Sequence, residues 1–210
     1  MLASNSANIA DLVRDNPAAI SAYLTESFAE NDASKAQKAL SAVMKAQNVQ
    51  ILARDAGLRR DALYRTFGGR IDPQLSRILK LLDAMNVRLS VVPGPDGSDT
   101  VAGRLSEAFA RADPADAILG LSEVVKSQNV SALALKLKIM RTTVYKTFGG
   151  TVDPTLSRVL NLFAALQVTS KFVTIEPKAT PPRPKLGRPK KPGRATVAKK
   201  KRTPDSLAGL

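Results

Sequence analysis

The sequence contains no cysteine and no histidine, and these absences exclude several classes of site. Without them the chain cannot form a disulfide, an iron–sulfur cluster, a zinc finger, a cysteine nucleophile or a Ser-His-Asp triad. Histidine is also the side chain that titrates near neutrality without help from its environment. An enzyme would therefore depend on tuned carboxylates or lysines. We expect no enzyme, no cofactor and no metal site.

Long apolar runs and acidic residues are also scarce. No stretch of about 18 apolar residues could span a membrane, and the first 20 residues lack the pattern of a secretory signal. Only 18 Asp and Glu oppose 32 Lys and Arg, which gives a net charge of +14 in 210 residues. We expect a cytoplasmic, nucleoid-associated protein with no membrane partner, whose partner is a polyanion and most often nucleic acid.

The chain repeats itself at an offset of 81 residues, which places Leu24 on Leu105. Of the 70 positions from 24 to 93, 31 are identical to their counterparts without a gap. The period is too long for one unit of a solenoid. We interpret the chain as two tandem copies of one small domain, which are called repeat 1 and repeat 2 below.

Composition divides the chain into five parts. Residues 1–16 are an N-terminal extension, 17–93 are repeat 1, and 101–175 are repeat 2. The linker, residues 94–100, is rich in Pro and Gly, which stop both helix and strand. Residues 177–210 hold 11 Lys or Arg, one acid and seven prolines. The tail, residues 176–210, lacks the apolar content to fold alone, and we expect it to be disordered.

Residues 51–67 have the pattern of a helix-turn-helix. A first short helix ends at Gly57, which can adopt the left-handed conformation that a tight turn between helices needs. Small Ala53 allows the two helices to cross closely, and a second short helix follows at residues 60–67. Repeat 2 has Lys138 at the turn position, where a positive φ is poorly tolerated. Either that turn differs or the second motif is degraded.

The remaining elements are predicted from caps and periodicity. Asn16-Pro17, Asp32 and Asp72-Pro73 mark helix starts, the last for a helix through Met85. Alternation predicts one strand at 87–91 and its counterpart at 168–173, and pairing of the two would relate the repeats by a pseudo-two-fold. The fold class is all-α with one short strand per repeat. The residues expected on buried faces are Leu40, Val43, Met44, Leu63, Phe67, Leu75, Ile78, Leu79 and Leu82.

If the motif is a helix-turn-helix, its second helix enters the major groove of DNA. Arg can bond guanine O6 and N7 together, while Lys, Thr and Tyr reach phosphates or base edges. Because the outward charges of the two copies differ, they are expected to recognise different half-sites. The candidate DNA-binding residues are Arg59, Arg60, Asp61, Tyr64 and Arg65 in repeat 1, and Arg141, Thr142, Thr143, Tyr145 and Lys146 in repeat 2.

Alternatives remain open for some of these side chains. Tyr64 and Tyr145 either face DNA or pack with their hydroxyls at the rim. Arg77 and its counterpart Arg158 either touch phosphate or form ion pairs with Asp61, Asp72 or Asp153.

The tail contains a segment that resembles an AT-hook. The Gly-Arg-Pro core of that motif lies extended in the narrow minor groove of A·T-rich DNA, and here it is residues 187–189, preceded by Leu186 where an arginine is usual. The alternative is a generic polybasic tail, and either form neutralises phosphates. The candidate contacts are Arg188, Lys190, Lys191 and Arg194.

A set of motifs is distributed over both repeats, at Tyr23-Leu24, Phe28, Val43, Lys45-Ala46-Gln47, Leu52–Leu58, Leu63-Tyr64-Arg65, Asp72-Pro73, Leu75-Ser76, Ile78–Leu82, Val125–Gln128, Ser131–Ala134, Pro154 and Leu156-Ser157. With these residues, each repeat resembles the addiction-module antidote family of bacterial helix-turn-helix proteins, the antitoxin side of toxin–antitoxin pairs. The resemblance implies a λ-repressor-like helical domain that binds an operator, with a toxin as a second candidate partner. Members are usually one repeat long and dimerise, so a fused pair could act as a monomeric pseudo-dimer or form a homodimer.

The sequence therefore favours a double-stranded DNA-binding protein, an antitoxin-type transcriptional repressor. Two recognition helices would occupy the major groove, and the tail would bind adjacent minor groove or phosphates. One alternative is an architectural nucleoid protein with weak A·T preference, and another is a toxin-binding or protein-interaction module. RNA is less favoured, because no aromatic platform for stacked bases is present.

Overall fold

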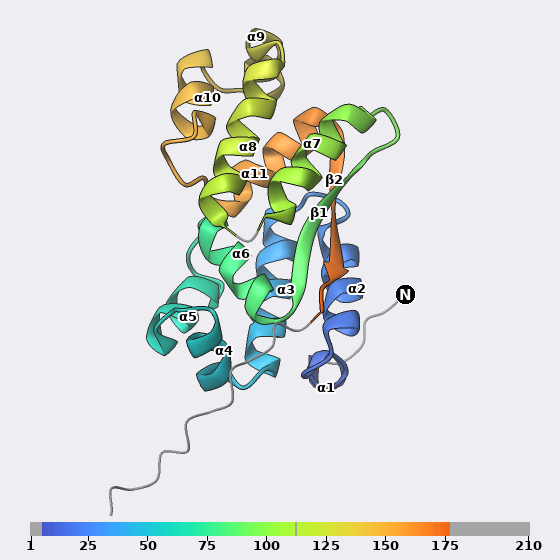
Figure 1. Cartoon of the computed structure of the whole chain (residues 1–210), viewed down its shortest axis with the longest axis vertical. Helices are drawn as coiled ribbons and strands as arrows, with labels where there is room; N and C mark the ends of the chain where they lie inside the picture. The colour runs from blue at the N-terminus through green and yellow to red at the C-terminus, as the bar shows by residue number, and fades with distance from the viewer. Residues whose placement is uncertain (1–5, 112, 177–210) are drawn as a thin grey trace, which may run out of the picture. The chain divides into compact units, whose positions relative to one another are not determined.

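A computed structural model describes residues 6–111 and 113–176, and the tail contacts predicted at Arg188, Lys190, Lys191 and Arg194 lie outside these residues. The described chain is mostly helical with one small sheet, which confirms a mainly-α class (Figure 1). Its first half contains α1 (Ser6–Val13), α2 (Pro17–Phe28), α3 (Ala33–Ala46), α4 (Val49–Asp55), α5 (Arg60–Phe67), α6 (Leu75–Ala84) and β1 (Val87–Pro93). Its second half contains α7 (Asp99–Ala110), α8 (Pro114–Ser127), α9 (Val130–Leu137), α10 (Arg141–Phe148), α11 (Leu156–Leu166) and β2 (Val168–Thr174).

Local signals placed most helix starts and core faces correctly. The side chain of Asn16 accepts a hydrogen bond from the amide of Ala19, and the side chain of Asp32 caps α3 in the same way. Helix α1, for which the sequence predicted no element, packs against α3 and buries Val13 completely. Of the residues expected in the core, Leu79 is half-buried, and those that are buried are Leu40, Val43, Met44, Leu63, Phe67, Leu75, Ile78 and Leu82.

The predicted pairing of the two strands is confirmed. β1 and β2 form an antiparallel ladder in which Ser90 lies opposite Lys171, its own counterpart at the offset of 81. A separate bridge joins Gln74 to Thr155, which are also counterparts. Equivalent positions meet each other only where a two-fold axis passes between them. The register therefore places a pseudo-two-fold axis through both pairs.

Each repeat packs its first long helix on the strand of the other repeat. Helix α2 lies on β2, and α7 lies on β1. The amide of Phe172 donates to Thr25 Oγ1 at 2.9 Å, and the amide of Val91 donates to Ser106 Oγ at 2.9 Å. The rings of Phe28 and Phe172 meet edge to face with centroids 4.9 Å apart. The two repeats thus share one core, and residues 6–111 and 113–176 belong to one compact unit.

Helix caps are exchanged between the repeats as well. Asp72 Oδ1 accepts from the backbone amide of Ser157, and Asp72 Oδ2 accepts from its hydroxyl, at 3.2 and 2.5 Å. Reciprocally, Asp153 accepts from the amide of Ser76 at 3.2 Å. Ser76 and Ser157 are the second residues of α6 and α11, whose amides have no partner within their own helices. Each carboxylate therefore caps the helix of the other repeat.

The prediction that Asp72-Pro73 caps the helix that follows it is wrong, and the counterpart pair in repeat 2, Asp153-Pro154, does not cap its own helix either. Helix α6 begins two residues later than a local cap at Asp72 would require, with Gln74 at the N-cap position and no side-chain bond. The carbonyl of Pro73 accepts from the amide of Leu156 at 2.8 Å. This bond holds the segment around Asp72 next to α11. The Asp72 carboxylate therefore accepts from the free amides of α11 and not from those of α6.

We expect Asp72 to make the free energy of unfolding depend on pH in the acidic range. Burial raises the pKa of its carboxyl, but hydrogen bonds from the side chains of Ser157, Thr155 and Gln37 and from the Ser157 amide outweigh burial and lower the pKa below its ordinary value. A depressed folded pKa stabilises the protein above the unfolded pKa of about 3.9, and this contribution is lost as pH falls further. Below about pH 4, the free energy of unfolding in urea should therefore fall more steeply for the wild type than for Asp72→Asn.

Ser157→Ala removes the hydroxyl donor to this carboxylate and keeps the backbone amide donor, so its acid slope should lie between those of the wild type and Asp72→Asn. Identical slopes for all three proteins would contradict a role for the exchanged cap.

Candidate nucleic-acid interface

The turn between α4 and α5 has the backbone that the sequence predicted. Gly57 has a φ of +63°, and the amide of Leu58 donates to the carbonyl of Ala53 at 2.8 Å. The same arrangement recurs in repeat 2, where Lys138 has a φ of +55° and the amide of Ile139 donates to the carbonyl of Ala134 at 3.1 Å. The second turn is therefore not different. Lys138 adopts the left-handed conformation despite its Cβ.

Lys138→Gly is expected to stabilise the protein, because a left-handed backbone costs an ordinary L-residue about 1 kcal/mol. The matched substitution Gly57→Lys places the same strain in repeat 1 and should destabilise by a similar amount. Urea unfolding of the two variants and the wild type measures both effects. Destabilisation by Lys138→Gly would contradict this account of the turn.

The outward sides of α5 and α10 carry the predicted side chains. Thr143 is half-buried, while the opposite sides of the two helices bury Leu63 and Val144. In Figure 1, α5 and α10 both lie on the left of the view, with α5 below and α10 above. The exposed predicted residues are Arg59, Arg60, Asp61, Tyr64, Arg65, Arg141, Thr142, Tyr145 and Lys146.

An arginine and a tyrosine form the same pair on each of these helices. The guanidinium of Arg60 lies over the ring of Tyr64 at 5.8 Å from its centroid, and Arg141 lies over Tyr145 at 5.9 Å. The two tyrosines are 41% and 42% exposed, so each is accessible from outside, and their contact with DNA stays a prediction. Cation–π contact restrains both side chains of a pair before any ligand binds.

Arg77 and Arg158 each donate a hydrogen bond to one of these helices. Arg77 donates to Thr66 Oγ1 at 3.1 Å, and Arg158 donates to Thr147 Oγ1 at 2.9 Å. Thr66 and Thr147 are buried in α5 and α10. No ion pair in the described part of the chain joins either arginine to Asp61, Asp72 or Asp153. Both arginines therefore tie the start of the next helix to α5 or α10, and their contact with phosphate stays a prediction.

The helix pairs α4–α5 and α9–α10 both carry a net positive charge. Residues 48–70 contain five Lys or Arg and two Asp, and residues 129–151 contain four Lys or Arg and no acid. One of the two acids, Asp55, is paired with Arg54 at 2.7 Å. In the described residues, no group of three or more acidic side chains could hold a metal ion, and no helix is long and apolar enough to cross a membrane.

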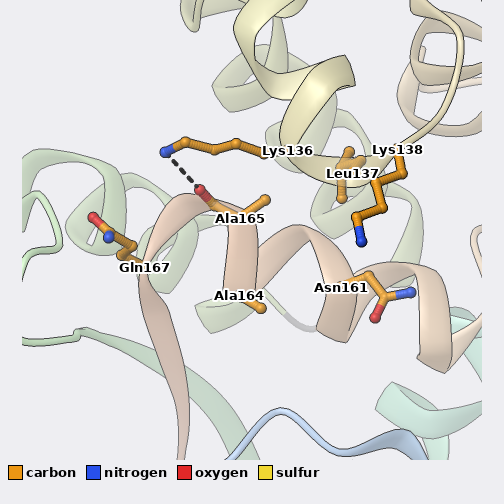
Figure 2. Close-up of a pocket in the computed structure, with 7 residues that line it drawn as sticks. All are labelled: Lys136, Leu137, Lys138, Asn161, Ala164, Ala165 and Gln167. Atoms are coloured by element: carbon orange, nitrogen blue, oxygen red, sulfur yellow. Dashed lines mark hydrogen bonds between the residues drawn. The ribbon is translucent and has the colours of Figure 1, made fainter.

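A hollow of about 480 Å³ lies beside the second turn (Figure 2). The Lys136 ammonium donates to the carbonyl of Ala165 at 3.3 Å, and Lys138 extends from the turn toward the α11 side of the hollow. A cation at the carboxyl end of a helix is stabilising, because the last carbonyls lack partners there. The hollow has no acidic side chain. Its lining residues are Lys136, Leu137, Lys138, Asn161, Ala164, Ala165 and Gln167.

The sequence patterns did not predict that Met140 and Leu135, two apolar residues of repeat 2, are strongly exposed. Met140 is the N-cap residue of α10 and is 77% exposed, and Leu135 near the end of α9 is 81% exposed. Their counterparts in repeat 1 are Arg59, which was predicted to contact DNA, and Arg54. The offset of 81 aligns Met140 with Arg59 in the sequence, and this correspondence could have identified Met140 as a candidate site residue.

These features define a mainly helical protein that displays two equivalent basic helix pairs. A family model described as "Probable addiction module antidote protein" matches residues 4–93, which end with the last residue of β1. An uncharacterized protein of Haemophilus influenzae is 32% identical over 72 residues, which is 34% of this chain and 74% of that relative. No solved structure matches the chain. The chain belongs to the addiction module antidote family.

Proposed function

We propose that the protein is an antitoxin-type transcriptional repressor that binds double-stranded DNA. One observation carries the proposal: the same exposed Arg–Tyr pair occurs on α5 and α10, which the pseudo-two-fold relates. Duplex DNA has its own approximate two-fold symmetry, so proteins with two related recognition helices bind two half-sites. This chain carries both helices in one polypeptide.

Helices α5 and α10 enter successive major-groove segments about 34 Å apart. Arg60 and Arg141 lie in the first turn of each helix, where side chains reach base edges, and they bond guanine O6 and N7. Arg65 and Lys146 contact phosphates at the far end of each helix. Such contacts fix the register of the protein on the duplex.

The tail adds affinity without sequence information. Residues 177–210 contribute ten of the fourteen net positive charges. Charges that neutralise phosphates release counterions, so affinity falls steeply as salt rises. Arg188, Lys190, Lys191 and Arg194 bind the adjacent minor groove or its phosphates.

Selection of duplexes from a random pool by the full chain tests the proposal, followed by footprinting on the selected site. Deletion of residues 177–210 should weaken binding and make the salt slope shallower, because fewer counterions are released. The preferred sequence should survive the deletion. Loss of that preference, or broad A·T-biased protection in place of a discrete footprint, would instead support the architectural role.

A second candidate function is binding of a toxin protein, because the matching family model is described as an addiction module antidote. The two functions are compatible when different surfaces serve them. Co-purification of the protein encoded beside this chain, with the complex surviving nuclease treatment, would support toxin binding. Isolation of the chain alone under the same conditions would contradict it.

A further inference from the structure

Met140 occupies a position where its side chain contributes nothing to the fold. It is the N-cap residue of α10, it makes no capping hydrogen bond, and it is 77% exposed. N-cap positions favour Ser, Thr, Asp or Asn, whose oxygens bind the free amides of the first turn. A residue that breaks a local rule without a gain in packing is typical of a functional position.

The two repeats differ systematically at the start of the recognition helix. Repeat 1 has Arg59-Arg60-Asp61, and repeat 2 has Met140-Arg141-Thr142. The central arginine is retained, while the charged residues on both sides are replaced by a thioether and by a threonine with its methyl group. All three side chains of repeat 2 are exposed. Repeat 2 therefore presents an apolar surface around one retained arginine.

The surroundings of Met140 identify the class of ligand. Residues 129–151 contain four cations and no acid, and the exposed cations nearest in sequence are Lys138 and Arg141. A polyanion fits this environment better than an apolar protein surface does, because each cation would have to be desolvated without a partner. In the major groove of DNA, the apolar feature of a base edge is the 5-methyl group of thymine.

We propose that Met140 contacts the 5-methyl group of a thymine in the half-site bound by α10, with the methyl group of Thr142 beside it. At the equivalent position of the other half-site, Arg59 contacts a polar base edge or a phosphate. The inference rests on the proposed function, because it requires that α10 lies in the major groove. It predicts that the two half-sites differ, with the methyl group of thymine contributing to affinity only in the half-site bound by α10.

Replacement of single thymines by deoxyuridine in the selected duplex tests this, because it removes the methyl group and leaves every hydrogen-bonding group in place. With the full-length wild type, one deoxyuridine in the α10 half-site should weaken binding about fourfold, the effect of exposing one buried methyl-sized group. Met140→Ala should bind the thymine duplex more weakly and should show a smaller further loss with deoxyuridine than the wild type, because the methyl group of Thr142 remains.

Arg59→Met is the matched gain-of-function variant. When the facing base in the other half-site is thymine, this variant should acquire a comparable sensitivity to deoxyuridine there. Arg59 and Met140 are both exposed, and neither side chain makes a capping hydrogen bond. The free energies of unfolding of Arg59→Met and Met140→Ala should therefore match that of the wild type.

The outcomes separate this inference from the proposed function. If the wild type binds the selected duplex and Met140→Ala retains the same sensitivity to deoxyuridine, the inference is overturned and the repressor proposal stands. If the full chain binds no duplex above its affinity for random sequence, the proposed function fails and the inference fails with it.

Discussion

Simultaneous replacement of Arg60 and Arg141 by alanine is expected to abolish sequence-specific DNA binding and to leave the fold intact. Each arginine lies at the start of an outward helix, over a half-exposed tyrosine, and neither forms part of the core. Loss of one bidentate contact to guanine costs about 1–3 kcal/mol, which is roughly a 5- to 150-fold loss of affinity. Fluorescence anisotropy with the selected duplex and with a scrambled duplex measures the effect.

The comparison between the two duplexes is decisive. Affinity for the scrambled duplex should fall little, because the remaining positive charges still neutralise phosphates. Arg104→Ala is the matched control, because Arg104 is an exposed arginine on α7, outside both helix pairs. It should leave the ratio of specific to non-specific affinity unchanged. Equal losses on the two duplexes for the double variant would mean that Arg60 and Arg141 contact only phosphates.

A chain cut after residue 93 is expected to fold only as a homodimer. In the full chain, β1 pairs with β2, α7 covers β1, and Asp153 caps α6, so repeat 2 supplies three parts of the folded environment of repeat 1. A second copy of residues 1–93 can supply equivalent parts, because the register centres on Ser90 opposite its own counterpart. The unfolding temperature should rise with protein concentration, as for other obligate dimers.

Sedimentation equilibrium with circular dichroism across a range of concentrations measures this coupling. In the homodimer, Phe28 would face Val91, which is the counterpart of Phe172. The lost aromatic contact leaves space in the core, and buried voids are destabilising. Val91→Phe in the fragment should therefore tighten the dimer. A fragment that unfolds cooperatively as a monomer, at a temperature independent of concentration, would contradict the shared core.

Local chemistry determined the elements that the sequence predicted correctly. Asn16 and Asp32 lie next to the amides that they cap, and Gly57 has the conformational freedom that its own turn needs. The strands alternate between buried and partly exposed residues over a few positions. The outward side of α5 was predictable for the same reason, because Leu63 and Phe67 identify the buried side one helical turn apart.

By itself, the sequence determined most of the helices, both strands, and the polar sides of α5 and α10, since each depends on residues close together along the chain. It also showed the repeat, through identities at a fixed offset of 81. The tertiary structure decided which repeat each cap serves, because the amides nearest in space to Asp72 belong to a segment 85 residues away. It also decided that Lys138 accepts a left-handed backbone, because packing of α9 and α10 fixes that turn whatever residue occupies it. The exposure of Met140 likewise depends on how α10 lies on the core, because helical periodicity does not extend to an N-cap residue, and the sequence could indicate it only through its counterpart Arg59.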